Sequence, residues 1–180
     1  MTNFGFLLIG LAAALGARVG APENRESNVA QHRTAFATPE SIRIEHEELH
    51  GDLAAATKLP GKTGAAAGHV AELLHPHFVA EEEFALPPLA LLRPLADGTV
   101  TPEMRDAVRL ADRLKAELPR MLAEHKAIVV ALEELGRAAR SEGHPDVVRF
   151  VEKLTAHAQH EEQVLYPAAI LVGEYLKLKV

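Results

Sequence analysis

The 180-residue chain contains no cysteine and no tryptophan. Without cysteine, it cannot form a disulfide framework, a zinc finger, an iron–sulfur cluster or a thiol nucleophile. Other aromatic residues are also few, with two Tyr and six Phe, whereas there are ten His. Metal ligation is the commonest reason for such an excess of His. Any bound metal must therefore be held by imidazole and carboxylate groups.

The chain also lacks a run rich in Lys and Arg. It carries 19 Lys and Arg against 25 Asp and Glu, which gives a formal net charge of -6 at pH 7. Because binding to phosphates requires a basic patch, we expect no nucleic-acid partner.

No strand pattern is present, and apolar residues instead recur at helical spacing. Four main helices are predicted, over about 38–57, 65–86, 119–141 and from 145 onward. The short turns between them predict an all-α fold, an antiparallel up-down-up-down four-helix bundle that spans residues 38–180.

Proline marks several of the expected helix boundaries. Thr38 is predicted to be the N-cap of the first helix, with Pro39 at the first helical position. We expect Pro76 to kink the second helix. Pro119 is expected to break or restart the helical pattern that begins at Thr101.

Residues 1–20 form a separate segment, because the run from Phe4 to Ala17 is apolar throughout and uncharged. An apolar N-terminal helix is expected here, followed by a linker over 21–37. The run is too short to cross a ~30 Å hydrocarbon core. Three interpretations stay open: a short membrane anchor or interfacial helix, a cleaved signal, and a helix packed on protein. Arg residues after the run favour a cytoplasmic domain that is membrane-associated through residues 4–17, with export as the alternative.

The most specific feature is a motif that occurs twice, eighty positions apart: His77-x-x-x-Glu81 and His157-x-x-x-Glu161. Each copy has a proline ten residues after its His. Residues four apart lie on one face of an α-helix. Each pair can therefore direct an imidazole and a carboxylate to one point.

Two further His extend this pattern. His46 and His125 lie on the inward faces of the first and third helices, and they precede His77 and His157 by 31 and 32 residues. The two halves of the bundle are therefore related by an internal two-fold repeat. The predicted metal ligands are His46, His77, Glu81, His125, His157 and Glu161. This mixed set of nitrogen and oxygen donors suits non-haem iron or another transition metal.

Residues next to these ligands are assigned other roles. His50 is either an extra metal ligand or a core residue beside the site. Glu82 and Glu162 sit one position off the ligand face, so we expect them beside the ligands or in solvent. The alternative is that they are themselves ligands, each five residues after its His. Phe84 and Val164 are expected on the ligand face, seven residues after their His.

Together, these residues resemble the hemerythrin-like (HHE cation-binding) family over roughly residues 38–170. The resemblance implies that single His on the first and third helices, and His-x-x-x-Glu pairs on the second and fourth, bind two non-haem iron ions. These ions (Fe2+ or Fe3+) would share an oxo or hydroxo bridge. Oxygen carriers of the family place a second His four residues after the one on the third helix. This chain has Val129 there, which argues against simple oxygen carriage.

Such a site would bind or react with dioxygen, hydrogen peroxide or nitric oxide. Peroxide breakdown or another redox activity at a diiron centre is one hypothesis, and it requires a reductant that the sequence does not identify. A non-enzymatic iron or oxygen sensor, or an iron-buffering protein, is the alternative.

Overall fold

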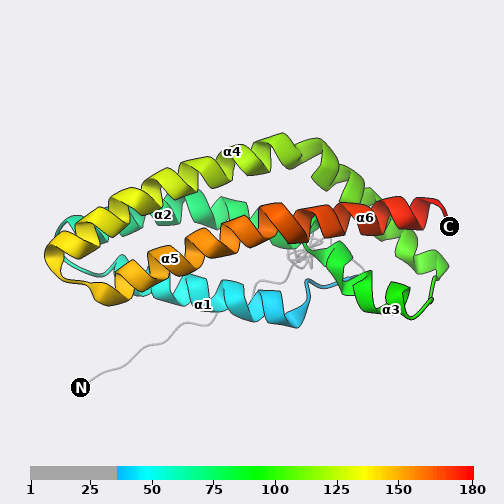
Figure 1. The fold of residues 1–180 in the computed structure, drawn as a ribbon, viewed down its shortest axis with the longest axis horizontal. Coiled ribbons are helices and arrows are strands. Elements are labelled where there is room, and N and C mark those ends of the chain that lie inside the picture. Colours follow the sequence, from blue (N-terminus) through cyan, green and yellow to red (C-terminus); the bar gives the residue numbers. More distant parts are fainter. Residues whose placement is uncertain (1–35) are drawn as a thin grey trace, which may run out of the picture. The chain divides into compact units, whose positions relative to one another are not determined.

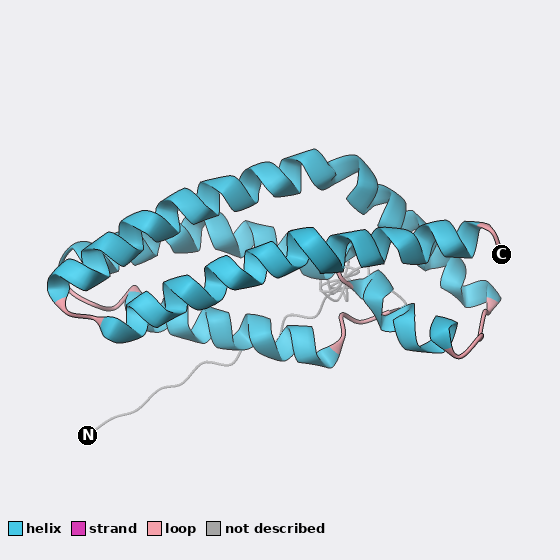
Figure 2. Ribbon diagram, viewed as in Figure 1, coloured by secondary structure: helices cyan, strands magenta, loops and turns pink. Residues whose placement is uncertain are grey.

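Residues 36–180 are described by the structure, a computed structural model. All regular structure in this range is helical (Figure 2), which confirms the prediction of an all-α fold for the described residues. The apolar segment expected at 1–20 and nearly all of the linker expected at 21–37 lie outside this range. Among the described helices, none is both long and apolar enough to cross a membrane.

Four helical columns lie side by side and form the bundle (Figure 1). They are α1 (Glu40–Ala56), α2 (Gly61–Ala80), α4 (Arg105–Glu142), and α5 (Pro145–His160) continued by α6 (Tyr166–Lys177). Short turns reverse the chain between α1 and α2 and between α4 and α5, so the helices of each pair run in opposite directions.

Smaller helical elements join the long helices. The π-helical turn η1 (Glu81–Ala85) follows α2, and a second π-helical turn, η4 (Glu161–Leu165), joins α5 to α6. The chain reaches α4 through two 3₁₀-helical turns and one short helix: η2 (Pro87–Leu91), α3 (Leu92–Ala96) and η3 (Pro102–Met104).

Two predicted helix starts were wrong, one by a single residue and the other by four. Pro39, not Thr38, is the N-cap of α1, and no side chain caps this end. Helix α2 begins at Gly61, four residues before the expected start. Glu142, at the end of α4, accepts hydrogen bonds from the backbone N–H groups of Lys62 (2.8 Å) and Thr63 (2.9 Å). This contact satisfies N–H groups that a helix start leaves unpaired, and it comes from a distant part of the chain.

The prediction that Pro119 breaks the helix was also wrong, because α4 is continuous through it. A proline inside a helix removes one backbone hydrogen bond and bends the axis. Figure 1 shows α4 changing direction between its green and yellow parts. Burial on both sides of the proline, at Leu114 and Met121, explains why the helix continues.

The apolar core consists of clusters that polar residues separate. The largest cluster includes Leu74, Leu132 and Leu135, and a second one includes Leu86 and Met121. On α4, His125 lies between Met121 of the second cluster and the first cluster's Ile128. The core therefore contains a polar layer.

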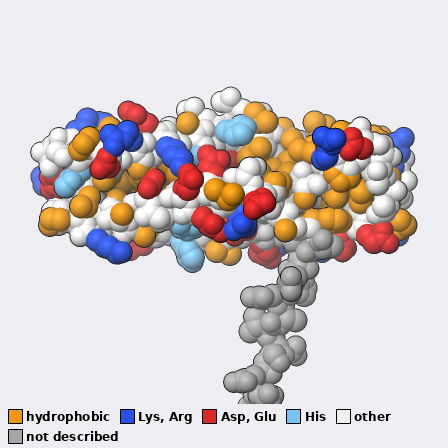
Figure 3. All heavy atoms as spheres, turned by 90° about the horizontal axis from the view of Figure 1, so that it is seen from below, with side chains coloured by type: hydrophobic (Ala, Val, Ile, Leu, Met, Phe, Trp, Pro, Cys, Tyr) orange, Lys and Arg blue, Asp and Glu red, His pale blue; other side chains and the backbone are white. Residues whose placement is uncertain are grey.

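The surface is charged over much of its area. Figure 3 shows Lys and Arg side chains intermixed with Asp and Glu over one half of the visible face, whereas apolar side chains gather over the other half. Exposed large apolar residues include Leu92 on α3 and Leu171 and Leu178 near the C-terminal end of the chain.

Candidate metal centre

The polar layer consists of the six residues that the sequence singles out. His46 comes from α1, His77 from α2, His125 from α4 and His157 from α5, while Glu81 and Glu161 begin the two π-helical turns. None of the six is more than 4% exposed. All four helical columns therefore contribute to one buried cluster.

The ligand atoms of the cluster fall into two overlapping groups. One ligand atom each of His77, Glu81, His125 and Glu161 lies within 4.8 Å of the others, and the same holds for His46, His157 and Glu161. The imidazoles of His77 and His125 are called the 77/125 pair, and those of His46 and His157 are called the 46/157 pair.

Both carboxylates lie between the two pairs. Oε1 of Glu161 is 3.1 Å from Nε2 of His157, whereas its Oε2 is 3.4 Å from Nε2 of His125. Similarly, Oε1 of Glu81 is 3.3 Å from Nε2 of His77, and its Oε2 is 3.9 Å from Nε2 of His46. Each carboxylate thus presents one oxygen to each pair of imidazoles.

The two π-helical turns set which side chains face the cluster. In a π-helical turn the backbone bond runs to the fifth residue, and Leu86 accordingly donates its N–H to the carbonyl of Glu81 (2.9 Å). Residues five positions after each Glu, Leu86 and Tyr166, are fully buried. Val164 is 49% exposed, so its expected inward position was wrong, although its counterpart Phe84 is buried as expected.

Each imidazole of the cluster also has a carboxylate beside its outer nitrogen. Nδ1 of His77 donates to Glu124 (2.8 Å), and Nδ1 of His125 donates to Glu162 (3.0 Å). Nδ1 of His46 donates to Glu82 (3.2 Å). Such contacts fix the ring orientation and direct Nε2 inward.

The fourth imidazole follows the same arrangement less closely. Nδ1 of His157 lies 3.3 Å from Oε1 of Glu45, without hydrogen-bond geometry. Sequence reasoning missed Glu45 and Glu124, although a signal was present, because each directly precedes a His of the cluster, His46 and His125. The structure places Glu82 and Glu162 beside the ligand atoms rather than among them.

The charges of the buried carboxylates are compensated unequally. Burial and the neighbouring Glu161 raise the pKa of Glu81. Burial also acts to raise the pKa of Glu161, but contacts with three imidazoles hold it well below the usual value. Burial acts to lower the pKa of His77, whereas Glu81 and Glu124 raise it to about 9. The two carboxylates therefore differ in the direction of their pKa shifts, although both are buried in the same cluster.

Several buried polar atoms of the cluster have no hydrogen-bond partner within the described residues. These atoms are Nε2 of His46, Oε2 of Glu81, both ring nitrogens of His157, and Oε1 of Glu161. Leaving such groups unpaired in a core costs about 1–3 kcal/mol each. Four of them converge between the carboxylates and the 46/157 pair, so the donor set fits a transition-metal ion.

Tyr166 is a member of the site that sequence reasoning missed. Its hydroxyl donates a hydrogen bond to Glu81 and lies 3.3 Å from Nε2 of His125 and 3.5 Å from Nε2 of His77. Its ring stacks on His125, with centroids 5.7 Å apart. Burial, followed by the charges of Glu81 and Glu161, raises the pKa of Tyr166.

His50 lies outside both groups of ligand atoms. Its ring packs edge-on against Phe78, at a centroid distance of 5.0 Å, and against His75, at 6.1 Å. Phe78 in turn stacks on His46, with centroids 4.1 Å apart. The structure therefore places His50 one aromatic ring away from the cluster.

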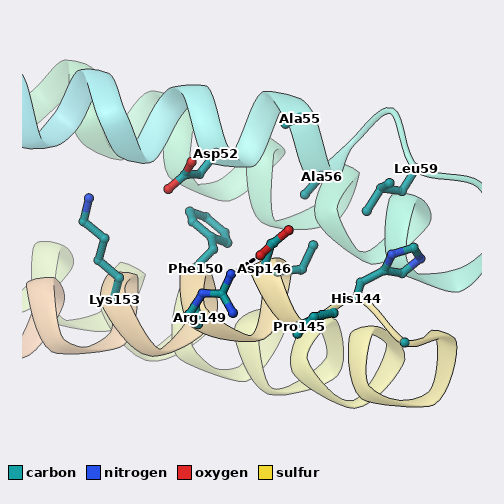
Figure 4. Close-up of a pocket in the computed structure, with 12 residues that line it drawn as sticks. Asp52, Ala55, Ala56, Leu59, His144, Pro145, Asp146, Arg149, Phe150 and Lys153 are labelled. Carbon is teal, nitrogen blue, oxygen red and sulfur yellow. Dashed lines mark hydrogen bonds and ion pairs between the residues drawn. The ribbon is translucent and has the colours of Figure 1, made fainter.

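A cavity of about 630 Å³ opens between α1 and α5, away from the cluster (Figure 4). Phe150 lies between the two helices, and Arg149 pairs with Asp146 in the cavity wall. None of the residues that line this cavity belongs to the cluster, so it adds nothing to the candidate metal centre.

The fold and the cluster define a class of protein: a helical bundle with a buried histidine and carboxylate site for a metal ion. The family description "Hemerythrin HHE cation binding domain" matches residues 30–169. The chain therefore belongs to this family, as its sequence motifs predicted. Comparison with curated proteins and with solved structures gave no match.

Proposed function

We propose that the cluster holds two non-haem iron ions and that the loaded protein binds or reacts with dioxygen, hydrogen peroxide or nitric oxide. One observation carries this proposal: Glu81 and Glu161 each present one oxygen to each pair of imidazoles. Each ion would thus have two imidazoles, with both carboxylates shared between the ions.

The bound iron would supply redox chemistry and open coordination positions for a small ligand. Carboxylates that accept hydrogen bonds from Nδ1 hold three of the four imidazoles, those of His46, His77 and His125, in place. Close packing around residues that are at most 4% exposed leaves the site suited to small ligands. Peroxide breakdown is the redox activity that we expect, with the reductant supplied from outside the chain.

Spectroscopy of anaerobically loaded protein tests this function. Addition of hydrogen peroxide should change the absorption spectrum and consume the peroxide, and His46→Ala and His125→Ala should each abolish consumption. His69→Ala is a suitable control because His69 is exposed on α2 and lies outside the cluster. Iron-loaded protein that responds to none of the three small ligands would contradict the proposal.

Air oxidation distinguishes redox turnover from oxygen carriage. Because Val129 stands where oxygen carriers have a further His, the ferrous protein should oxidise to the ferric form in air. An absorbance change that degassing reverses would instead indicate oxygen carriage.

The unpaired buried atoms favour a second candidate function. Metal binding would satisfy them and so stabilise the bundle, as required of a non-enzymatic iron or oxygen sensor or an iron buffer. Such a protein would show metal-linked stability without peroxide turnover.

A further inference from the structure

The two halves of the site differ at one position of the internal repeat. Tyr166 follows His157 by the same spacing at which Leu86 follows His77. Both side chains are fully buried, and both lie five residues after the Glu of their half. The repeat therefore supplies a phenol oxygen in one half and no polar atom in the other.

The phenol oxygen lies on the side of the 77/125 pair. It contacts Glu81 and approaches Nε2 of His125 and of His77 to 3.3 and 3.5 Å. Metal–nitrogen bonds of about 2.1 Å place neighbouring ligand atoms roughly 3.0 to 3.5 Å apart. The hydroxyl is thus at the distance expected of another ligand to the same ion.

The 46/157 pair has the opposite character. Nε2 of His46, Nε2 of His157 and the carboxylate oxygens that face them, Oε2 of Glu81 and Oε1 of Glu161, all lack hydrogen-bond partners within the described residues. On the other side of the cluster, the Tyr166 hydroxyl contacts both inner nitrogens of the 77/125 pair. The two halves of the site are therefore chemically unequal.

We propose that Tyr166 is a metal ligand: its phenol oxygen binds the ion held by the 77/125 pair, and the exchangeable coordination position lies at the 46/157 pair. This inference rests on the proposed function, because it requires the cluster to hold metal. On binding, the phenol O–H bond breaks, an oxygen–metal bond forms, and the proton leaves to solvent, as protons leave other protein ligands.

The consequence is a division of roles within a site whose sequence repeat suggests symmetry. Three side chains would bind only the ion at the 77/125 pair: His77, His125 and Tyr166. Glu81 and Glu161 would be shared between the two ions. A small ligand would therefore enter at the 46/157 pair. The absence of a His at Val129 would by itself leave the two ions equally accessible, and the Tyr166 hydroxyl makes them different.

The test uses the full-length, iron-loaded ferric protein and its two tyrosines. Phenolate bound to ferric iron gives an intense visible charge-transfer absorption, so resonance Raman spectra excited in that band should show tyrosine ring modes. Tyr166→Phe should lose the band while keeping its iron. Tyr175→Phe is the matched control, because Tyr175 is 40% exposed and is the only other tyrosine.

Tyr175→Phe also provides a test that does not depend on Tyr166→Phe folding correctly. In that background Tyr166 is the sole tyrosine, so ring-deuterated tyrosine should shift the Raman modes without any change in the site. Absence of the band in iron-loaded wild type, or its persistence in Tyr166→Phe, would overturn this inference but not the proposed function. Failure of every variant and of the wild type to take up metal would instead overturn the proposed function.

Nitric oxide gives a second readout. Ferrous wild-type protein should bind about one nitric oxide per chain, at the exchangeable position, and Tyr166→Phe should bind about two. Equal binding by the two proteins would contradict the assignment of the exchangeable position to the 46/157 pair.

Discussion

At the scale of single residues, the imidazoles of the cluster are constrained on both sides. Carboxylates beside Nδ1 orient the rings, and Glu81 and Glu161 lie beside Nε2. The inner and outer carboxylates therefore have different roles, although in each half they are adjacent in sequence: Glu81 with Glu82, and Glu161 with Glu162.

This difference predicts a graded loss of metal. Glu81→Ala and Glu161→Ala should abolish stoichiometric iron binding, because each removes oxygens that face both pairs. Glu82→Ala and Glu162→Ala should weaken metal affinity by about 10–100-fold. Elemental analysis after dialysis measures both effects, and equal losses in all four variants would contradict the roles assigned here.

Glu124 provides an independent test of the outer carboxylates. It accepts a hydrogen bond from His77 and is itself paired with Arg120. Glu124→Ala should weaken metal affinity by about 10–100-fold. Glu117→Ala is the matched control, since Glu117 also pairs with Arg120 on α4 but holds no imidazole. If both variants lost metal equally, the effect would come from Arg120 and not from His77.

The six inner residues could be predicted from sequence because the His-x-x-x-Glu spacing repeats and depends only on helix geometry. Tyr166 could not be predicted in the same way. Five residues after Glu161, it would lie off the ligand face of a regular α-helix, and the π-helical turn η4 brings it inward. The same turn explains why Val164 is exposed.

At the scale of helices, contacts between distant parts of the chain decide where elements begin. Helix α2 starts at Gly61, which has a positive φ of 79° and lies against Glu142. Glu142 also accepts a hydrogen bond from the hydroxyl of Thr63 (2.6 Å). Local sequence signals did not show this cap, because its acceptor is about eighty residues away. Helix α4 likewise continues through Pro119 because of packing that local signals do not reveal.

The cap predicts a pH-dependent contribution to stability. Hydrogen bonds from Thr63 and Lys62 lower the pKa of Glu142 to about 2. A carboxyl whose pKa is lower in the folded state stabilises the fold above its unfolded pKa, and this stabilisation is lost as the pH falls through the folded value. Glu142→Gln should therefore have a lower Tm than wild type at pH 7, and the difference should shrink between about pH 4.5 and pH 2.

Thermal melts at a series of pH values measure this effect. Glu133→Gln serves as the control because Glu133 is an exposed carboxylate on the same helix. A Tm difference for Glu142→Gln that stays constant down to pH 2 would show that the carboxylate's charge does not matter to the cap.

At the scale of the whole molecule, the bundle surrounds a polar layer that is poorly satisfied without metal. The all-α fold was predictable because helical periodicity and short turns are local properties. The pairing of the two halves around one site followed from the repeat. The unequal chemistry of the halves did not, because it depends on side chains that only the folded structure brings together.

Metal removal should destabilise the whole bundle. A ligand that binds only the folded state stabilises it by about 4 kcal/mol when its free concentration is a thousand times Kd. At roughly 2–4 °C per kcal/mol for a chain of this size, chelation should lower the Tm measurably. Calorimetry of loaded and chelated protein gives the comparison. Equal Tm values would indicate a site that protein contacts alone preform, and would weaken the sensor alternative.

The central claim is that the cluster holds two iron ions. Elemental analysis of protein expressed with excess iron and purified anaerobically tests it most directly, with the metal content expressed per chain. We predict about two iron ions per chain, reduced to below one in His46→Ala and in His125→Ala. One tightly bound ion or none in the wild type, or zinc alone, would contradict the claim.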